Sequence, residues 1–105
     1  MIIFIYINMN EDLKILRAIS DETRLKIAKL LCSGEKCGSE LMLLVGKSQP
    51  NISIHLSKLR DAGIIESRRD GKKIYYFFSN EKAKKIIDIV NEDKIIEPHD
   101  FIEEV

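Results

Sequence analysis

The stretch from Ser48 to Gly63, SQPNISIHLSKLRDAG, constrains the fold more than any other part of the sequence. It predicts a single helix, because the Ser48 hydroxyl can accept a hydrogen bond from a free amide of the first turn. Pro50 suits a first turn that needs no amide donor, and Gly63 suits a left-handed C-terminal cap. The apolar positions recur at the spacing of helical turns and form one narrow stripe: Ile52, Leu56 and Leu59.

The opposite face of this predicted helix is polar and basic. It carries Gln49, Asn51, Ser53, Ser57, Lys58 and Arg60. Side chains of these types donate hydrogen bonds to phosphates and to the edges of bases. The helix is therefore either one that enters a DNA major groove or an ordinary amphipathic surface helix.

The flanking patterns predict a winged helix-turn-helix, an α+β fold that is mainly helical. Apolar periodicity and capping residues predict helices over residues 11–19, 21–32, 39–45 and 81–91, with Asn10 as the cap of the first. Gly46 and Lys47 form a tight turn between two helices, as in a helix-turn-helix. After Gly63 the pattern predicts strands over 64–69 and 73–78, joined at Asp70-Gly71. We expect about five helices and a two-stranded hairpin.

The predicted hairpin is basic, with Arg69, Lys72 and Lys73 near its turn. A basic hairpin that follows a recognition helix can lie along a DNA backbone or minor groove as a wing. The alternative is a solvated turn whose charges only confer solubility. The distribution of charge favours DNA, because residues 47–85 hold ten basic and four acidic side chains although the whole chain has a formal charge of zero.

Three regions follow from this pattern. Residues 1–9 are an apolar extension, either a segment that packs on a partner subunit or an over-long start with Met9 as the initiator. Residues 10–91 form the winged helix-turn-helix DNA-binding domain, whose last helix has more apolar surface than one small monomer needs and is expected to pack on a partner helix. Residues 92–105 form an acidic tail.

Composition limits the setting and the class of activity. The chain has two cysteines and no secretory signal, which predicts a reduced, cytoplasmic location without a disulfide framework. No apolar run approaches the roughly 20 residues that span a bilayer, so we expect no membrane insertion. No nucleophile–base pair, phosphate loop or histidine cluster indicates an enzyme.

Four motifs resemble the ArsR/SmtB family of winged-helix repressors. They are SDETRLKIAKLL at 20–31, GEKCGSEL at 34–41, SQPNISIHLSKLRDAGI at 48–64 and ESRRDGKKIYYFFS at 66–79. The resemblance covers about three quarters of the chain, from Leu13 to Val90. It implies a homodimer built from the first and last helices. This dimer would bind an imperfect palindromic operator as an autoregulatory repressor and be released by an inducer.

The resemblance also implies roles for particular residues. Gln49 and Ser53 match positions that read bases, and three others lie beside them: Ser48, Asn51 and Lys58. Arg69, Lys72 and Lys73 match the wing. His55 either touches a phosphate or braces the helix.

The two cysteines do not identify the signal that would act as the inducer. Arsenic- and cadmium-sensing relatives carry a Cys-x-Cys pair where this chain has Cys37 and Ser39, and only Cys32 lies nearby. Two thiols would need further ligands, from a partner subunit, Glu40 or His99, to hold As(III), Cd(II) or Zn(II). A second sensing site of the family needs histidine on the last helix, where residues 80–92 have none. Thiol oxidation, or no thiol-based sensing at all, are the alternatives.

A second function class also remains open, because winged helices can serve as protein-docking modules without effector sensing. Such a module needs no basic outer face. The two classes differ in the salt dependence of binding, which is steep only for a partner that releases counterions, as DNA does.

Overall fold

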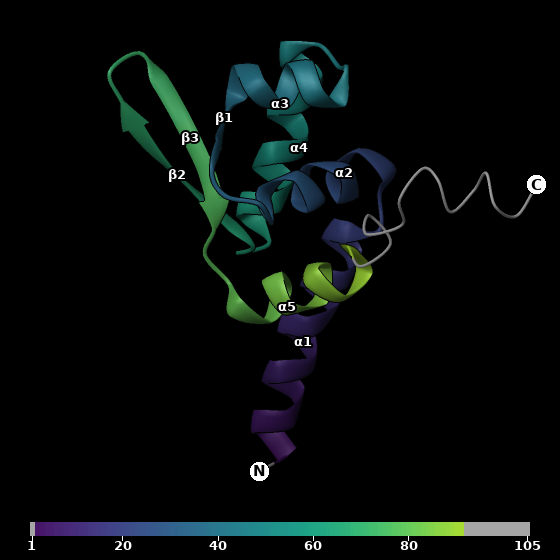
Figure 1. Cartoon of the computed structure of the whole chain (residues 1–105). Helices are drawn as coiled ribbons and strands as arrows, with labels where there is room; N and C mark the ends of the chain where they lie inside the picture. Colours follow the sequence, from purple (N-terminus) through teal and green to yellow (C-terminus); the bar gives the residue numbers. More distant parts are fainter. Residues whose placement is uncertain (1, 92–105) are drawn as a thin grey trace, which may run out of the picture.

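The computed structural model describes the backbone of residues 2–91 and the side chains of residues 9–91. Its elements, in order, are α1 (Ile2–Ile19), α2 (Glu22–Leu31), β1 (Lys36–Cys37), α3 (Gly38–Val45), α4 (Gln49–Asp61), β2 (Ile65–Asp70), β3 (Lys73–Phe78) and α5 (Glu81–Val90). Figure 1 shows α2, α3 and α4 packed together, with the β2–β3 hairpin rising beside them and α5 lying across α1. The expected winged helix-turn-helix with five helices is confirmed.

Helix α4 begins and ends where its capping residues predict. The Ser48 hydroxyl accepts from the amide of Asn51 at 3.4 Å, and a proline occupies the first turn. Gly63, which follows the helix, has φ of 74°. That left-handed conformation strains residues with a Cβ atom, so glycine is favoured there. Gly46, which caps the C-terminus of α3, is also left-handed, with φ of 77°.

The sheet has three strands in the order β1-β3-β2, whereas the sequence predicted only the β2–β3 hairpin. The additional strand, β1, consists of two residues: Lys36 pairs with Tyr76, and Cys37 pairs with Tyr75. A strand this short carries no periodic signal, and its hydrogen bonds reach residues almost forty positions away. It joins the start of α3 directly to the wing.

Helix α1 is longer than predicted. It starts at Ile2 and continues past Asn10 without a break, so Asn10 is not its cap. The upstream residues continue the helical backbone, and their carbonyls satisfy the amides that a cap would otherwise serve. None of the described helices is long and apolar enough to cross a bilayer.

The core is formed by the inward faces of all five helices and the start of β2. Ile15, Ile27, Leu41 and Leu59 are fully buried in it. On α1 the inward face is formed by Ile15, Ala18 and Ile19. Leu13 and Leu16, which helical spacing groups with Ile19, are exposed. The predicted acidic tail, residues 92–105, lies outside the described residues.

Candidate nucleic-acid interface

Helix α4 turns the predicted apolar stripe into the core and its polar face outward. Ile52, Leu56 and Leu59 are at most 3% exposed. Gln49 and Ser53, the predicted base-reading residues, are exposed, as is Lys58 in the last turn. The N-terminal half of α4 can therefore approach a groove without unfolding or repacking any part of the core.

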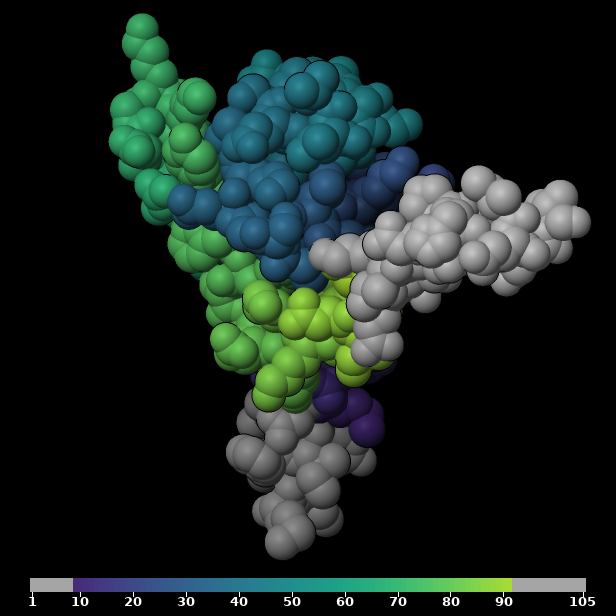
Figure 2. Space-filling view, in the orientation of Figure 1, coloured from purple at the N-terminus to yellow at the C-terminus, as the bar shows by residue number. Residues whose placement is uncertain are grey.

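The wing presents its basic side chains to solvent. Arg69, Lys72 and Lys73 are exposed around the turn, and the hairpin tip projects beyond the rest of the surface (Figure 2). Asp70 pairs with Lys73, so the hairpin turn is Gly71-Lys72, and Gly71 supplies φ of 63°.

Arg68, one position before the predicted wing cations, has a different environment. Its guanidinium donates two hydrogen bonds to the Glu35 carboxylate and lies 4.7 Å from the centroid of the Tyr75 ring. This ion pair holds the pKa of Glu35 below its usual range, mainly through the hydrogen bonds from Arg68. The charge of Arg68 is therefore already paired, and the ion pair joins the wing to the loop before β1.

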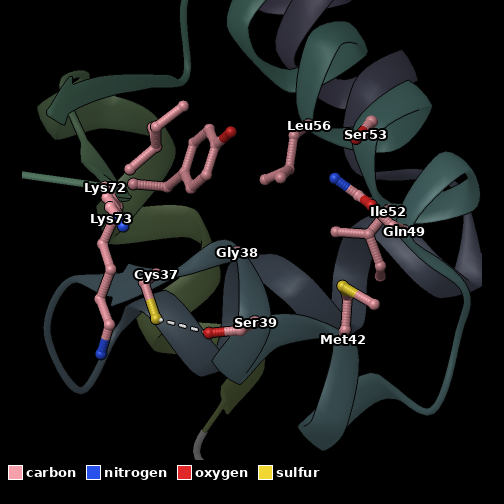
Figure 3. Close-up of a pocket in the computed structure, with 12 residues that line it drawn as sticks. Cys37, Gly38, Ser39, Met42, Gln49, Ile52, Ser53, Leu56, Lys72 and Lys73 are labelled. Carbon is pink, nitrogen blue, oxygen red and sulfur yellow. Dashed lines mark hydrogen bonds between the residues drawn. The ribbon is translucent and has the colours of Figure 1, made fainter.

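The recognition helix and the wing share one cavity of about 360 Å³. Gln49 and Ser53 line it from α4, Lys72 and Lys73 line it from the wing, and Ser39 lines it from α3. Figure 3 shows these side chains arranged around the opening, with the lysines on the side opposite α4. Four of the predicted DNA-binding residues, which lie up to 24 positions apart in the sequence, therefore line this cavity. It is called the recess below.

Three other predicted DNA-binding residues do not line this cavity and have different surroundings. The Ser48 hydroxyl is used as the α4 cap. Asn51 is half-buried, and its Oδ1 atom is buried without a hydrogen-bond donor among the described residues. His55 is turned onto α2: its side chain is 16% exposed, and its Nδ1 atom accepts from Arg24 Nη1 at 3.2 Å.

The His55 contact belongs to a small polar cluster that holds α4 on the start of α2. The carboxylate of Asp21 caps α2 by accepting from the Arg24 amide at 3.0 Å, and it lies 3.7 Å from His55 Nδ1. The hydrogen bond from the Arg24 amide lowers the pKa of Asp21, with a further contribution from the Arg24 charge. The His55 ring therefore contacts two residues at the start of α2.

Sequence reasoning missed one residue on the outer face of α4. Ile54 is 56% exposed, next to Ser53. Its helical position could have been found from the sequence, because it is offset from the buried stripe of Ile52, Leu56 and Leu59.

Cys37 lies at the junction of the sheet, α3 and the cavity. It is 3% exposed and acts as the N-cap residue of α3. Its Sγ atom is 3.1 Å from Ser39 Oγ, as the dashed line in Figure 3 shows, and its amide donates to Glu40 Oε1 at 3.1 Å. That amide hydrogen bond is the main reason that the pKa of Glu40 lies below its usual range.

The described part of one chain does not assemble a complete metal site. Cys32 is partly buried at the end of α2, and no disulfide joins it to Cys37. Within residues 9–91, no group of three or more Cys, His, Asp or Glu side chains converges on a point that could hold an ion. As(III), Zn(II) and Cd(II) commonly take three or four such ligands, so these two thiols do not satisfy them alone.

A family model for bacterial regulatory proteins of the arsR family matches residues 21–67. The "probable mercury resistance operon repressor" of Streptomyces lividans is 39% identical over 71 residues, which is 68% of this chain and 57% of that protein. The arsenical resistance operon repressor of Escherichia coli is 40% identical over 80 residues, which is 72% of this chain and 68% of that protein. The alignment thus spans little more than half of the Streptomyces protein.

Among solved structures, a homodimeric winged helix-turn-helix DNA-binding domain from Mycobacterium bovis superposes with a TM-score of 0.75. It is 25% identical, and the match covers 81% of this chain and 79% of that one. The Streptomyces and Escherichia relatives are named as operon repressors, in agreement with the expectation that the chain is not an enzyme.

Proposed function

Since this chain belongs to the ArsR family of bacterial regulatory proteins, we propose that it is a homodimeric transcriptional repressor that binds an imperfect palindromic operator and is released by an inducer. Helix α4 enters the major groove, where Gln49 and Ser53 read bases. Arg69, Lys72 and Lys73 of the wing bind the backbone beside it, and Lys58 adds a phosphate contact. Ser48, Asn51 and His55 position α4 from its cap and its inner side.

One observation carries this proposal: exposed residues of the recognition helix and of the wing line the same recess. Gln49 and Ser53 face it from one side, and Lys72 and Lys73 from the other (Figure 3). Hydrogen-bonding side chains for bases and cations for phosphates therefore lie at one surface, as contact with a single duplex requires. A protein-docking module has no need of this pairing.

The salt dependence of binding tests the proposal. We expect the full chain to bind a duplex obtained by selection from a random library, with fluorescence anisotropy reporting affinity. Each protomer brings four basic side chains to the DNA backbone: Lys58 and the three of the wing. Because each phosphate contact releases counterions, a dimer should show a slope of log affinity against log salt of roughly −7. A slope near zero, or binding only to proteins, would favour the docking alternative.

An apolar surface on α1 and α5 supports the homodimer. Met9, Leu13 and Leu16 recur at helical spacing on α1 and are 39–51% exposed, and Ile89 of α5 is 67% exposed. The ion pair between Asp12 and Lys82, at 2.9 Å, holds the two helices together. A second copy of the chain would remove this apolar surface from water. The added burial would stabilise the domain, because a chain this small has only a modest core of its own.

Replacing Leu16 with glutamate is expected to convert the dimer into a monomer, because a buried carboxylate at the interface would have no partner. Sedimentation velocity measures the outcome. Leu43→Glu is the matched control, since Leu43 is 83% exposed on α3, away from α1 and α5. A Leu16→Glu chain that remains dimeric would place the interface elsewhere.

The same proposal assigns release to a signal that acts on the Cys37 thiol. Cys37 begins α3, and its backbone pairs with Tyr75 of the wing strand. A change at this thiol would therefore move the helix-turn-helix and the wing together. A soft ion such as As(III), Cd(II) or Zn(II) would use Cys32 and Cys37 only with further ligands from outside the described residues or from a second subunit.

Replacing Cys37 with serine is expected to preserve operator binding and to abolish release. Serine is a favourable N-cap residue, so α3 should still begin at the same place. Gel mobility shift with As(III), Cd(II), Zn(II) or a mild oxidant identifies the signal, and Cys32→Ser tests the second thiol. A Cys37→Ser chain that is released as readily as the wild type would remove the thiol from the mechanism.

A further inference from the structure

The outer face of α4 contains one aliphatic side chain among polar ones. Ile54 is 56% exposed. It lies one turn after Pro50 and one turn before Ser57, so the three residues form a row along the helix. The row is separate from the buried stripe, and Gln49 and Ser53 lie next to it on the same exposed surface.

Ile54 does not contribute to the core, and it is a costly choice for an exposed helical position. A β-branched side chain loses rotamer freedom in a helix, and lysine, glutamine or glutamate has a higher helix propensity. Single exposed aliphatic residues are common on protein surfaces. This one, however, lies in the middle of the surface that approaches the bases, where every neighbouring side chain is polar or is Pro50.

The chemistry of the major groove supplies one apolar partner for such a side chain. Base edges present hydrogen-bond donors and acceptors there, and the only methyl group is that on C5 of thymine. An isoleucine facing a guanine or cytosine edge would remove polar atoms from water without replacing their hydrogen bonds.

Resting on the proposed function, we infer that Ile54 is a specificity-determining residue that selects thymine by packing on its C5 methyl group. Ser53 and Gln49 read neighbouring bases by hydrogen bonds, so the helix combines polar and apolar readout within two turns. Burial of one methyl group corresponds to about a fourfold change in affinity per half-site, and about fifteenfold for two half-sites.

Thymine-to-uracil replacement tests this inference, because it removes only the C5 methyl group. The full chain is first used to select duplexes from a random library. Each thymine of the selected site is then replaced by uracil, singly and in symmetric pairs, and affinity is measured by fluorescence anisotropy for the wild type and for Ile54→Ala. Leu43→Ala, which shortens an exposed aliphatic side chain on α3, is the matched control.

We expect one thymine per half-site at which uracil weakens the wild type and Leu43→Ala about fourfold but leaves Ile54→Ala unchanged. Ile54→Ala should melt no lower than the wild type, since the side chain lies outside the core cluster and alanine has the higher helix propensity. Equal sensitivity of the wild type and Ile54→Ala at every thymine would overturn the inference while leaving the proposed function intact. A chain that enriches no duplex would overturn both.

Discussion

Replacing Gln49 with alanine is expected to weaken binding to the selected operator by about 1–3 kcal/mol per half-site and to relax base preference. Gln49 is exposed at the first position of α4 and lines the recess between that helix and the wing. Its amide can donate to and accept from a base edge at once, so alanine loses both hydrogen bonds. Anisotropy titrations against the operator and a scrambled duplex measure the two affinities.

The control variant carries Lys72→Ala and Lys73→Ala together. These lysines are exposed on the wing and line the same recess. Because they bind the backbone in the proposed complex, the double variant should weaken operator and scrambled duplex alike. It should also lower the salt slope by about one for each phosphate that the wing no longer neutralises. If Gln49→Ala also weakens both duplexes equally, Gln49 does not read bases.

The recognition helix was predictable because its signals are local. Ser48, Pro50 and Gly63 lie within one turn of its two ends, and each acts on neighbouring backbone groups. The wing was predictable for the same reason, since Asp70 and Gly71 mark a hairpin whose strands pair across two residues. Elements of this kind need no knowledge of the rest of the fold.

Elements that depend on distant partners were not predictable. Strand β1 exists because Lys36 and Cys37 meet Tyr75 and Tyr76 of β3, and two residues carry no alternation of their own. On α1, helical spacing groups Leu13, Leu16 and Ile19, but only the arrangement of the other helices determines that Ile19 is buried and both leucines are exposed.

For the candidate site, the sequence indicates the residue types but not the surroundings of each side chain. Gln49, Ser53, Lys72 and Lys73 are brought to one recess as expected of a recognition helix and a wing. His55 has the chemistry of a phosphate ligand, yet its ring contacts Arg24 of α2, 31 positions away. Composition could not reveal that contact, because it depends on how α4 crosses α2.

Replacing Leu59 with alanine is expected to reduce the free energy of unfolding by about 2–5 kcal/mol. Leu59 is 0% exposed and lies in the buried stripe of α4, within the main core. Alanine would remove apolar packing and leave a cavity that the surrounding helices fill only in part. Urea denaturation measures the change in stability, at one fixed protomer concentration because dimerisation contributes to apparent stability.

Ile54→Ala is the matched control on the same helix. Both substitutions remove an aliphatic side chain from α4, but Ile54 is 56% exposed. The contrast separates the two faces of the helix: Leu59→Ala should destabilise the fold and lower DNA affinity only through the unfolded fraction. Ile54→Ala should leave stability unchanged and alter DNA affinity directly. Comparable destabilisation of both variants would mean that the outward face of α4 is packed in solution, and would contradict its assignment as a free surface for DNA.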